Sequence, residues 1–156
     1  MTITIGYTNS DAVRAAVGVT DNEFPDTALS SLLLEKALYL DLYQWVPTHA
    51  AVHAAGVASG ATTEAQMKAS SLELYSTWFA ARQIANTPFG VLNKITDGKE
   101  EVARFLDAKV LAQVAAHASS QLAEYRQQLE DLQGSAAATV SVMGAATPSY
   151  NPVTNQ

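Results

Sequence analysis

The residues best placed to do chemistry are two histidines four positions apart, His49 and His53. On a helix, this spacing puts both imidazole rings on one face, as in zinc proteases. Those enzymes also require a glutamate directly after the first histidine, and this chain has Ala50 there. Because the sequence places no third ligand, we expect a pair of solvated or hydrogen-bonded histidines and no metal site.

Other catalytic patterns are missing from the sequence. No glutamate is followed three positions later by a histidine, as di-iron helical bundles require. There is also no glycine-rich phosphate loop followed by lysine, no nucleotide fingerprint and no Gly-x-Ser-x-Gly elbow. His117 lies in an apolar run, which is typical of a packed or interface histidine. We therefore expect a protein that is not an enzyme and that binds no cofactor.

The composition is low in charge and acidic. Of the 156 residues, 48% are hydrophobic and only 15% are charged, against about 25% charged in an average domain. Nine Lys and Arg against fifteen Asp and Glu give a formal net charge of −6, which disfavours a protein that wraps DNA through its phosphates. The absence of cysteine excludes disulfides and thiolate chemistry. An alanine-rich, uncharged surface of this kind predicts a homo-oligomer.

The apolar periodicity predicts an all-α fold: a four-helix bundle-like domain with an extended N-terminal strand and a long extended C-terminal arm. We expect an arm over 1–9, the helical domain over 10–133 and a docking arm over 134–156. We see no basic leader followed by an apolar run and no transmembrane stretch, so we expect no signal peptide and no membrane contact. The four helices are expected from about 10 to 17, from 25 to the residues before Pro47, from 63 to the residues before Pro88, and from 98 to 133.

The N-terminal arm is predicted from strict alternation. Ile3, Ile5 and Tyr7 alternate with smaller residues, which is the period of a strand with one apolar face. The first helix then begins at a cap provided by Thr8 or Ser10.

The second predicted helix is apolar almost all round. A helix of this kind lies at the centre of a core or between subunits. Its main apolar stripe is expected to comprise Leu29, Leu32, Leu33, Ala37, Leu40 and Tyr43, and the opposite side Leu34, Leu38, Leu42 and Trp45.

The start of the last helix is predicted from Asp97 and Glu100, which have the spacing of a capping box. In that motif each side chain bonds a free amide at the start of a helix. Glu101 adds a second acidic side chain to the first turn, where the helix dipole favours it.

The stretch from Ser135 to Gln156 contains no charged residue and alternates at Val140 and Val142. Flexible tails are usually rich in charge, so we expect an arm that docks by adding a strand to a neighbouring sheet edge. A plain flexible terminus is the alternative. The docking residues are predicted to be Val140, Val142, Met143, Tyr150 and Val153.

Two segments resemble the head–tail connector proteins of tailed bacteriophages, also called adaptor or head completion proteins. They are DAVRAAVGVTDNEFPDTAL, Asp11 to Leu29, and NKITDGKEEVARF, Asn93 to Phe105. The resemblance implies a structural virion protein that forms a ring, commonly of about twelve subunits, beneath the portal. The ring would be located in the virion neck after synthesis in the host cytoplasm.

The resemblance also implies the partners of such a ring. Its C-terminal extension, Val140 to Val153, would engage the portal protein, and its other end would meet a downstream tail or stopper protein. DNA would pass through the channel without specific binding, because a wall of repeated acidic subunits repels phosphates. Asp97, Glu100 and Glu101 are the candidate channel-facing residues.

Two other functions remain open at this point. A terminase small subunit also forms a ring that recognises DNA, but it needs a basic helix-turn-helix, whereas the basic residues here are dispersed along the chain. A helical interaction protein that is not part of the virion is the other alternative.

Overall fold

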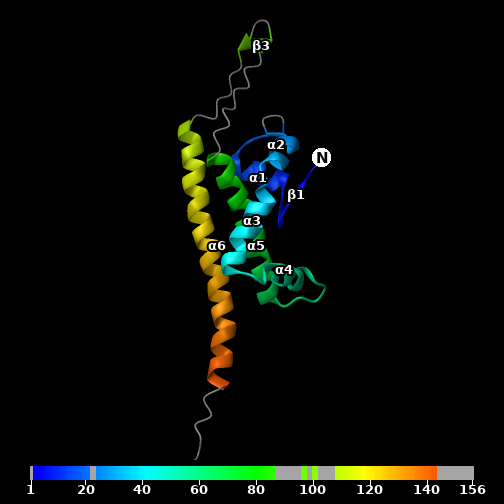
Figure 1. Cartoon of the computed structure of the whole chain (residues 1–156), viewed down its shortest axis with the longest axis vertical. Coiled ribbons are helices and arrows are strands. Elements are labelled where there is room, and N and C mark those ends of the chain that lie inside the picture. The colour runs from blue at the N-terminus through cyan, green and yellow to red at the C-terminus, as the bar shows by residue number, and fades with distance from the viewer. Residues whose placement is uncertain (1, 22–23, 87–95, 98–99, 102–107, 144–156) are drawn as a thin grey trace, which may run out of the picture.

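The computed structural model describes residues 2–21, 24–86, 96–97, 100–101 and 108–143, and these are mostly helical (Figure 1). Short strands form hairpins, one of them at the N-terminus, so the predicted helical domain preceded by a strand is confirmed. The elements are β1 (Thr4–Ile5), β2 (Thr8–Asn9), α1 (Ser10–Val17), α2 (Asp26–Ser31), α3 (Leu34–Trp45), α4 (His49–Val57), α5 (Thr63–Asn86), β3 (Thr96–Asp97), β4 (Glu100–Glu101) and α6 (Ala108–Met143).

The N-terminal strand turns back on itself as a hairpin. β1 and β2 pair antiparallel, with Ile5 opposite Thr8, and Gly6 adopts a left-handed conformation (φ 60°) in the turn. One step further from the turn, the amide of Ser10 donates to the carbonyl oxygen of Ile3 at 2.9 Å. The strand prediction is therefore correct, but the expected single extended run is wrong because Gly6 permits a tight reversal.

Helix α1 has the predicted bounds and different capping. The side chain of Asn9, rather than Thr8 or Ser10, accepts from the amide of Ala12 at 2.9 Å. Gly18 ends the helix in a left-handed conformation (φ 81°), and its amide donates to the carbonyl oxygen of Arg14.

A buried arginine joins α1 to the start of α2. The guanidinium of Arg14 donates to the Asp26 carboxylate at 2.8 Å, to the Asp11 carboxylate at 2.9 Å and to the carbonyl oxygen of Phe24 at 3.2 Å. The bond from Arg14 holds the pKa of Asp26 below its ordinary value of 3.8. This network fixes the path of the chain between the two helices, because a buried guanidinium must keep its partners.

The predicted second helix is broken into α2 and α3. The break lies at Leu32 and Leu33, and Leu33 has a left-handed backbone (φ 51°) that a leucine rarely adopts. A break of this kind changes the helical phase, so the predicted apolar stripe does not continue from α2 into α3. On α3 it is Leu34, Leu38 and Leu42 that are buried, while Leu33, Leu40 and Tyr43 are exposed. The predicted division into two sides is therefore present in α3, and it is the second side that faces the core.

Helix α5 lies at the centre of the domain and contributes to both parts of the core. Its buried residues form a broad face, and Trp78 contacts both clusters. The first cluster joins β1, α1, α2 and the start of α3 to the second half of α5: Ile5, Val13, Val17, Val19, Phe24, Leu29, Leu34, Ala80, Ala81 and Ile84. The second joins α3, α5 and α6: Leu38, Leu42, Leu72, Tyr75, Phe79, Leu122 and Leu129.

The start of α6 differs from the prediction. Asp97 and Glu100 lie opposite each other in the β3–β4 hairpin, so they do not form a capping box, and α6 begins at Ala108. Two residues, Gly98 and Lys99, connect the paired positions. Glycine at the first of two connecting residues is a hairpin signal. The prediction of a capping box did not take this signal into account.

The end of α6 also differs from the prediction. The helix continues through Gly134 to Met143, so the expected extended conformation of Val140 and Val142 was wrong. One glycine inside a helix costs only about 1 kcal/mol relative to alanine. The three alanines that follow at 136–138 are the best helix formers, which favours continuation. Tyr150 and Val153 lie outside the described residues.

Helix α4 packs closely against the first half of α5 at a glycine. Gly56 is buried, and a side chain on it would collide with the carbonyl oxygen of Ala65 and with the Cβ of Ala69. Backbone is difficult to displace, so Gly56 sets the distance between these two helices.

The variant Gly56→Ala should therefore lower the free energy of unfolding by about 1–3 kcal/mol, which is typical of overpacking. Urea denaturation followed by circular dichroism measures this loss. The matched control is Ala55→Ser, at an exposed neighbouring position of α4, which should change stability by less than about 0.5 kcal/mol. Equal stability of Gly56→Ala and the parent chain would show that α4 does not pack as described.

Candidate assembly surface and tyrosine–histidine cluster

The two histidines His49 and His53 lie in a cluster of aromatic rings. Tyr7 comes from the β1–β2 turn, Tyr39 and Tyr43 from α3, and His49 and His53 from α4. The ring of Tyr7 lies 4.5 Å from that of His53, and Tyr39 stacks on His49 at 5.5 Å between ring centroids. Tyr43 meets His49 edge-on at 5.3 Å. We call these five residues the tyrosine–histidine cluster.

The polar atoms of the cluster form hydrogen bonds. The Tyr7 hydroxyl is bonded to Nδ1 of His49, and Nε2 of His53 lies 3.1 Å from the Glu73 carboxylate. Burial, followed by the neighbouring Tyr39 and Tyr43, raises the pKa of Tyr7 to about 12. The Tyr7 hydroxyl therefore keeps its proton at neutral pH, and the tautomer of His49 sets which of the two atoms donates.

The arrangement holds the N-terminal hairpin against α3 and α4. The described residues contain no group of three or more His, Asp or Glu side chains that could hold a metal ion. Each histidine of the pair instead has one polar protein partner, as the sequence predicted. His49 is also buried, which the sequence did not predict.

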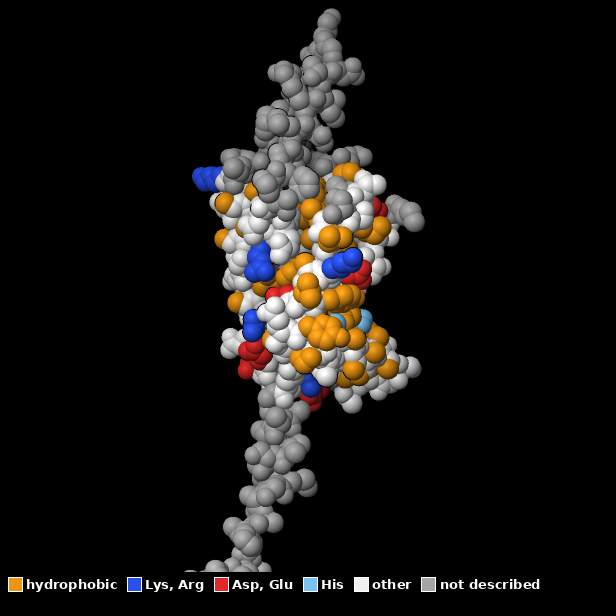
Figure 2. All heavy atoms as spheres, viewed as in Figure 1, with side chains coloured by type: hydrophobic (Ala, Val, Ile, Leu, Met, Phe, Trp, Pro, Cys, Tyr) orange, Lys and Arg blue, Asp and Glu red, His pale blue; other side chains and the backbone are white. Residues whose placement is uncertain are grey.

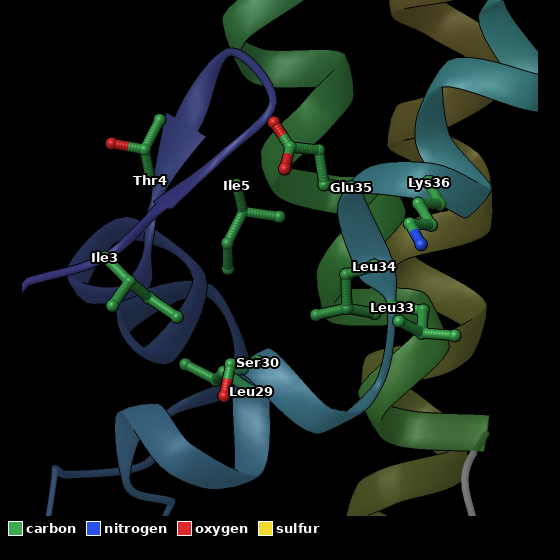
Figure 3. A pocket seen from close by; sticks show the side chains of 9 residues that line it. All are labelled: Ile3, Thr4, Ile5, Leu29, Ser30, Leu33, Leu34, Glu35 and Lys36. Atoms are coloured by element: carbon green, nitrogen blue, oxygen red, sulfur yellow. The ribbon is translucent and has the colours of Figure 1, made fainter.

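A small apolar hollow lies between β1 and the α2–α3 break (Figure 3). Its volume is about 250 Å³, which is room for one apolar side chain. Glu35 and Lys36 are the charged residues in its wall, and the Glu35 carboxylate also accepts from the Tyr39 hydroxyl at 3.2 Å. The wall is formed by Ile3, Thr4, Ile5, Leu29, Ser30, Leu33, Leu34, Glu35 and Lys36.

Beside this hollow, α3 carries an apolar stripe open to solvent. Leu33, Leu40 and Tyr43 are 60%, 70% and 64% exposed, and Lys36 lies between them on the same face. Their spacing of three and four residues repeats that of a helix seam that packs against another helix. We call these four residues the α3 stripe. Figure 2 shows hydrophobic side chains gathered over the face that carries α3 and α4.

The predicted N-terminal arm residues are part of the subunit's own structure. Ile5 is buried in the first core cluster, and Ile3 packs against that cluster. Tyr7 belongs to the tyrosine–histidine cluster. This segment is therefore held within the subunit and does not extend as a free arm.

The other predicted site residues are dispersed in the chain. The acidic residues Asp97, Glu100 and Glu101 are together in the β3–β4 hairpin. Val140, Val142 and Met143 are in the last turns of α6, at the opposite end of that helix from the hairpin (Figure 1). None of the helices in the described parts of the chain has the length and apolar content of a membrane span.

Two features were not predicted from the sequence: that the α3 stripe is exposed, and that the tyrosine–histidine cluster forms one unit. The stripe has a sequence signal, the heptad-like spacing of Leu33, Lys36, Leu40 and Tyr43. A lysine within an apolar seam indicates an exposed side, because a fully buried lysine is rare.

Comparisons of the chain with models of known protein families, with curated proteins and with solved structures found no match.

The cluster predicts a pH dependence of stability. Burial lowers the pKa of His49 below its ordinary value of 6.5, so the unfolded chain binds a proton at this residue before the folded chain does. The contribution of His49 is complete above about pH 7 and is lost as the pH falls through the unfolded value. The variant His49→Gln should therefore lose less stability than the parent chain between about pH 7.5 and pH 5.5 in urea denaturation.

The control for this experiment is His117→Gln. His117 is exposed and touches Trp78 edge-on at 4.9 Å between ring centroids. This variant tests whether loss of any histidine, rather than of His49 alone, changes the slope of stability against pH. Identical slopes for His49→Gln and the parent chain would contradict the assignment.

Proposed function

We propose that the protein is the subunit of a homo-oligomeric ring that joins the head of a tailed bacteriophage to its tail, beneath the portal. The observation that carries this proposal is the α3 stripe, in which two leucines and a tyrosine are more than half exposed. Side chains of this kind in a row mark an interface with another protein. A ring of identical subunits uses such a surface on every copy.

The charge distribution supports a ring through which DNA passes. The formal net charge of each chain is −6, and a ring multiplies this charge around its channel, which repels phosphates. Asp97, Glu100 and Glu101 fit a position on the channel wall, because they are concentrated in one hairpin. Packaged DNA would then pass along the wall without specific binding.

The basic residues favour the connector over a DNA-recognition ring of the terminase small subunit type. Arg14 is buried and paired with Asp11 and Asp26. On α6, Arg126 is paired with Glu130, and its guanidinium lies 5.0 Å from the centroid of the Trp45 ring. The buried guanidinium of Arg14 is therefore poorly available to phosphates, whereas Arg126 is half exposed. Weak or absent duplex DNA binding at moderate salt is expected of the connector.

The proposed partners are the portal protein above the ring and a tail or stopper protein below it. We assign portal binding to the chain beyond α6, where Tyr150 and Val153 lie in an uncharged sequence. Val140, Val142 and Met143 then provide its helical base, since α6 extends to Met143.

The proposal is tested first by the copy number of this chain in purified virions. Quantitative mass spectrometry should find about one copy per portal subunit, since matched closed symmetry requires that ratio. Absence from the particle would contradict the proposal and favour the alternative of a helical interaction protein outside the virion.

A second experiment tests the C-terminal docking segment. A chain ending at Met143 should keep the melting temperature of the full chain, because both core clusters lie in earlier residues. Its affinity for purified portal should fall by about tenfold or more, equivalent to about 1.4 kcal/mol or more. A chain with a Gly/Ser segment of equal length after Met143 is the control for length. Portal binding equal to that of the full chain in either variant would contradict the assignment.

A further inference from the structure

Helices α3 and α6 lie side by side and run in the same direction (Figure 1). The guanidinium of Arg126 on α6 lies over the ring of Trp45 on α3. Nearer the starts of the two helices, Leu34 belongs to the first core cluster and Val114 packs against the same cluster. Both helices rise about 1.5 Å per residue, so the α3 stripe is level with about residues 114–124 of α6.

The outer side of α6 at this level is uncharged and small. From Val110 to Ala123 there is no Asp, Glu, Lys or Arg. Ala112, Ala116, Ser120 and Ala123 are all exposed, and their spacing puts them on one face of the helix. Ala118, Leu122 and Leu129 face the core instead. This small-residue face therefore points away from its own subunit.

The two surfaces complement each other in shape. The α3 stripe is a ridge of bulky side chains, and the small side chains on this face of α6 allow another helix to approach closely. We propose that, in the ring proposed above, the α3 stripe of each subunit packs against the small-residue face of α6 in the next copy of this chain. Rotation about an axis along the helices keeps residues at the same level, so the two surfaces meet over their whole length.

The charges of the two surfaces are compatible with this pairing. Lys36 faces a part of α6 that has no basic residue to repel it. Tyr43 is level with Glu124, which ends the uncharged stretch and offers a carboxylate to a tyrosine hydroxyl. The proposed contact therefore joins the α3 stripe to the small-residue face of α6, and the Glu124 carboxylate lies at its end as a hydrogen-bond acceptor.

The symmetry of the contact favours a ring over a dimer. The two surfaces differ and lie on different helices, so the contact is head-to-tail, and every subunit uses both surfaces in a closed ring. Each subunit in a ring is then held by two such contacts.

The natural absence of cysteine allows a direct test. The double variant Leu40→Cys with Ser120→Cys places one thiol on each surface at the same level. Under mild oxidation the purified full chain should form a ladder of disulfide-linked multimers in denaturing gels. Each single variant should stay unlinked, and so should the control pair Leu40→Cys with Gln66→Cys, whose second thiol is at an exposed position on α5.

The outcomes separate this inference from the proposed function. Dimers from Leu40→Cys alone would overturn it in favour of a two-fold α3–α3 contact, and a monomer at all concentrations would also overturn it. A ring in native mass spectrometry without a ladder would show that other faces form the ring, so the inference would fail while the connector proposal stands. The variant Ser120→Arg should lose the ring with an unchanged melting temperature, and a retained ring would overturn the inference.

Discussion

The structure depends on the need to cover α5 on almost all sides. This helix contributes Leu72, Tyr75 and Phe79 to one core cluster and Ala80, Ala81 and Ile84 to the other. Long helices with a single buried face leave the other face to solvent, whereas α5 is enclosed by α1, α3, α4 and α6. Small residues such as Ala69 and Ala81 let these neighbours approach closely. The positions of the N-terminal hairpin and of α3 follow from this arrangement.

Much of the fold could be predicted from the sequence, because the apolar periodicity and the helix start and stop signals agree there. The bounds of α1 follow from the apolar pattern and from Gly18, and α5 lies between residue 63 and Pro88 as predicted. The break at Leu33 could not be predicted, because a leucine in a left-handed conformation has no local signal. It is tolerated because Leu29 and Leu34 are both buried on either side of it. Asp97 fits two local patterns, a helix cap and a hairpin, and the structure places it in the β3–β4 hairpin.

The site was less predictable because it is formed by residues distant in the sequence. The Tyr7–His49 bond joins residues 42 positions apart, and no periodicity reports such a contact. The exposed side of α3 depends on helical phase, which a break resets. The apolar residues of α3 indicated a helix that is apolar on almost all sides, but they did not determine which side is exposed. The spacing of His49 and His53 correctly placed them on one helix, whereas their partners Tyr7 and Glu73 come from other elements and could not be predicted.

The division of the core also has a consequence for synthesis on the ribosome. The hairpin and α1 are assembled from contacts within the first 17 residues, such as the bond from Ser10 to Ile3. Their apolar side chains include Ile5, Val13 and Val17. The core cluster that buries them is complete only when Ala80, Ala81 and Ile84, near the end of α5, are in place. During translation these groups therefore remain uncovered until α5 has left the exit tunnel. Over that interval the nascent chain exposes apolar surface of the kind that chaperones bind.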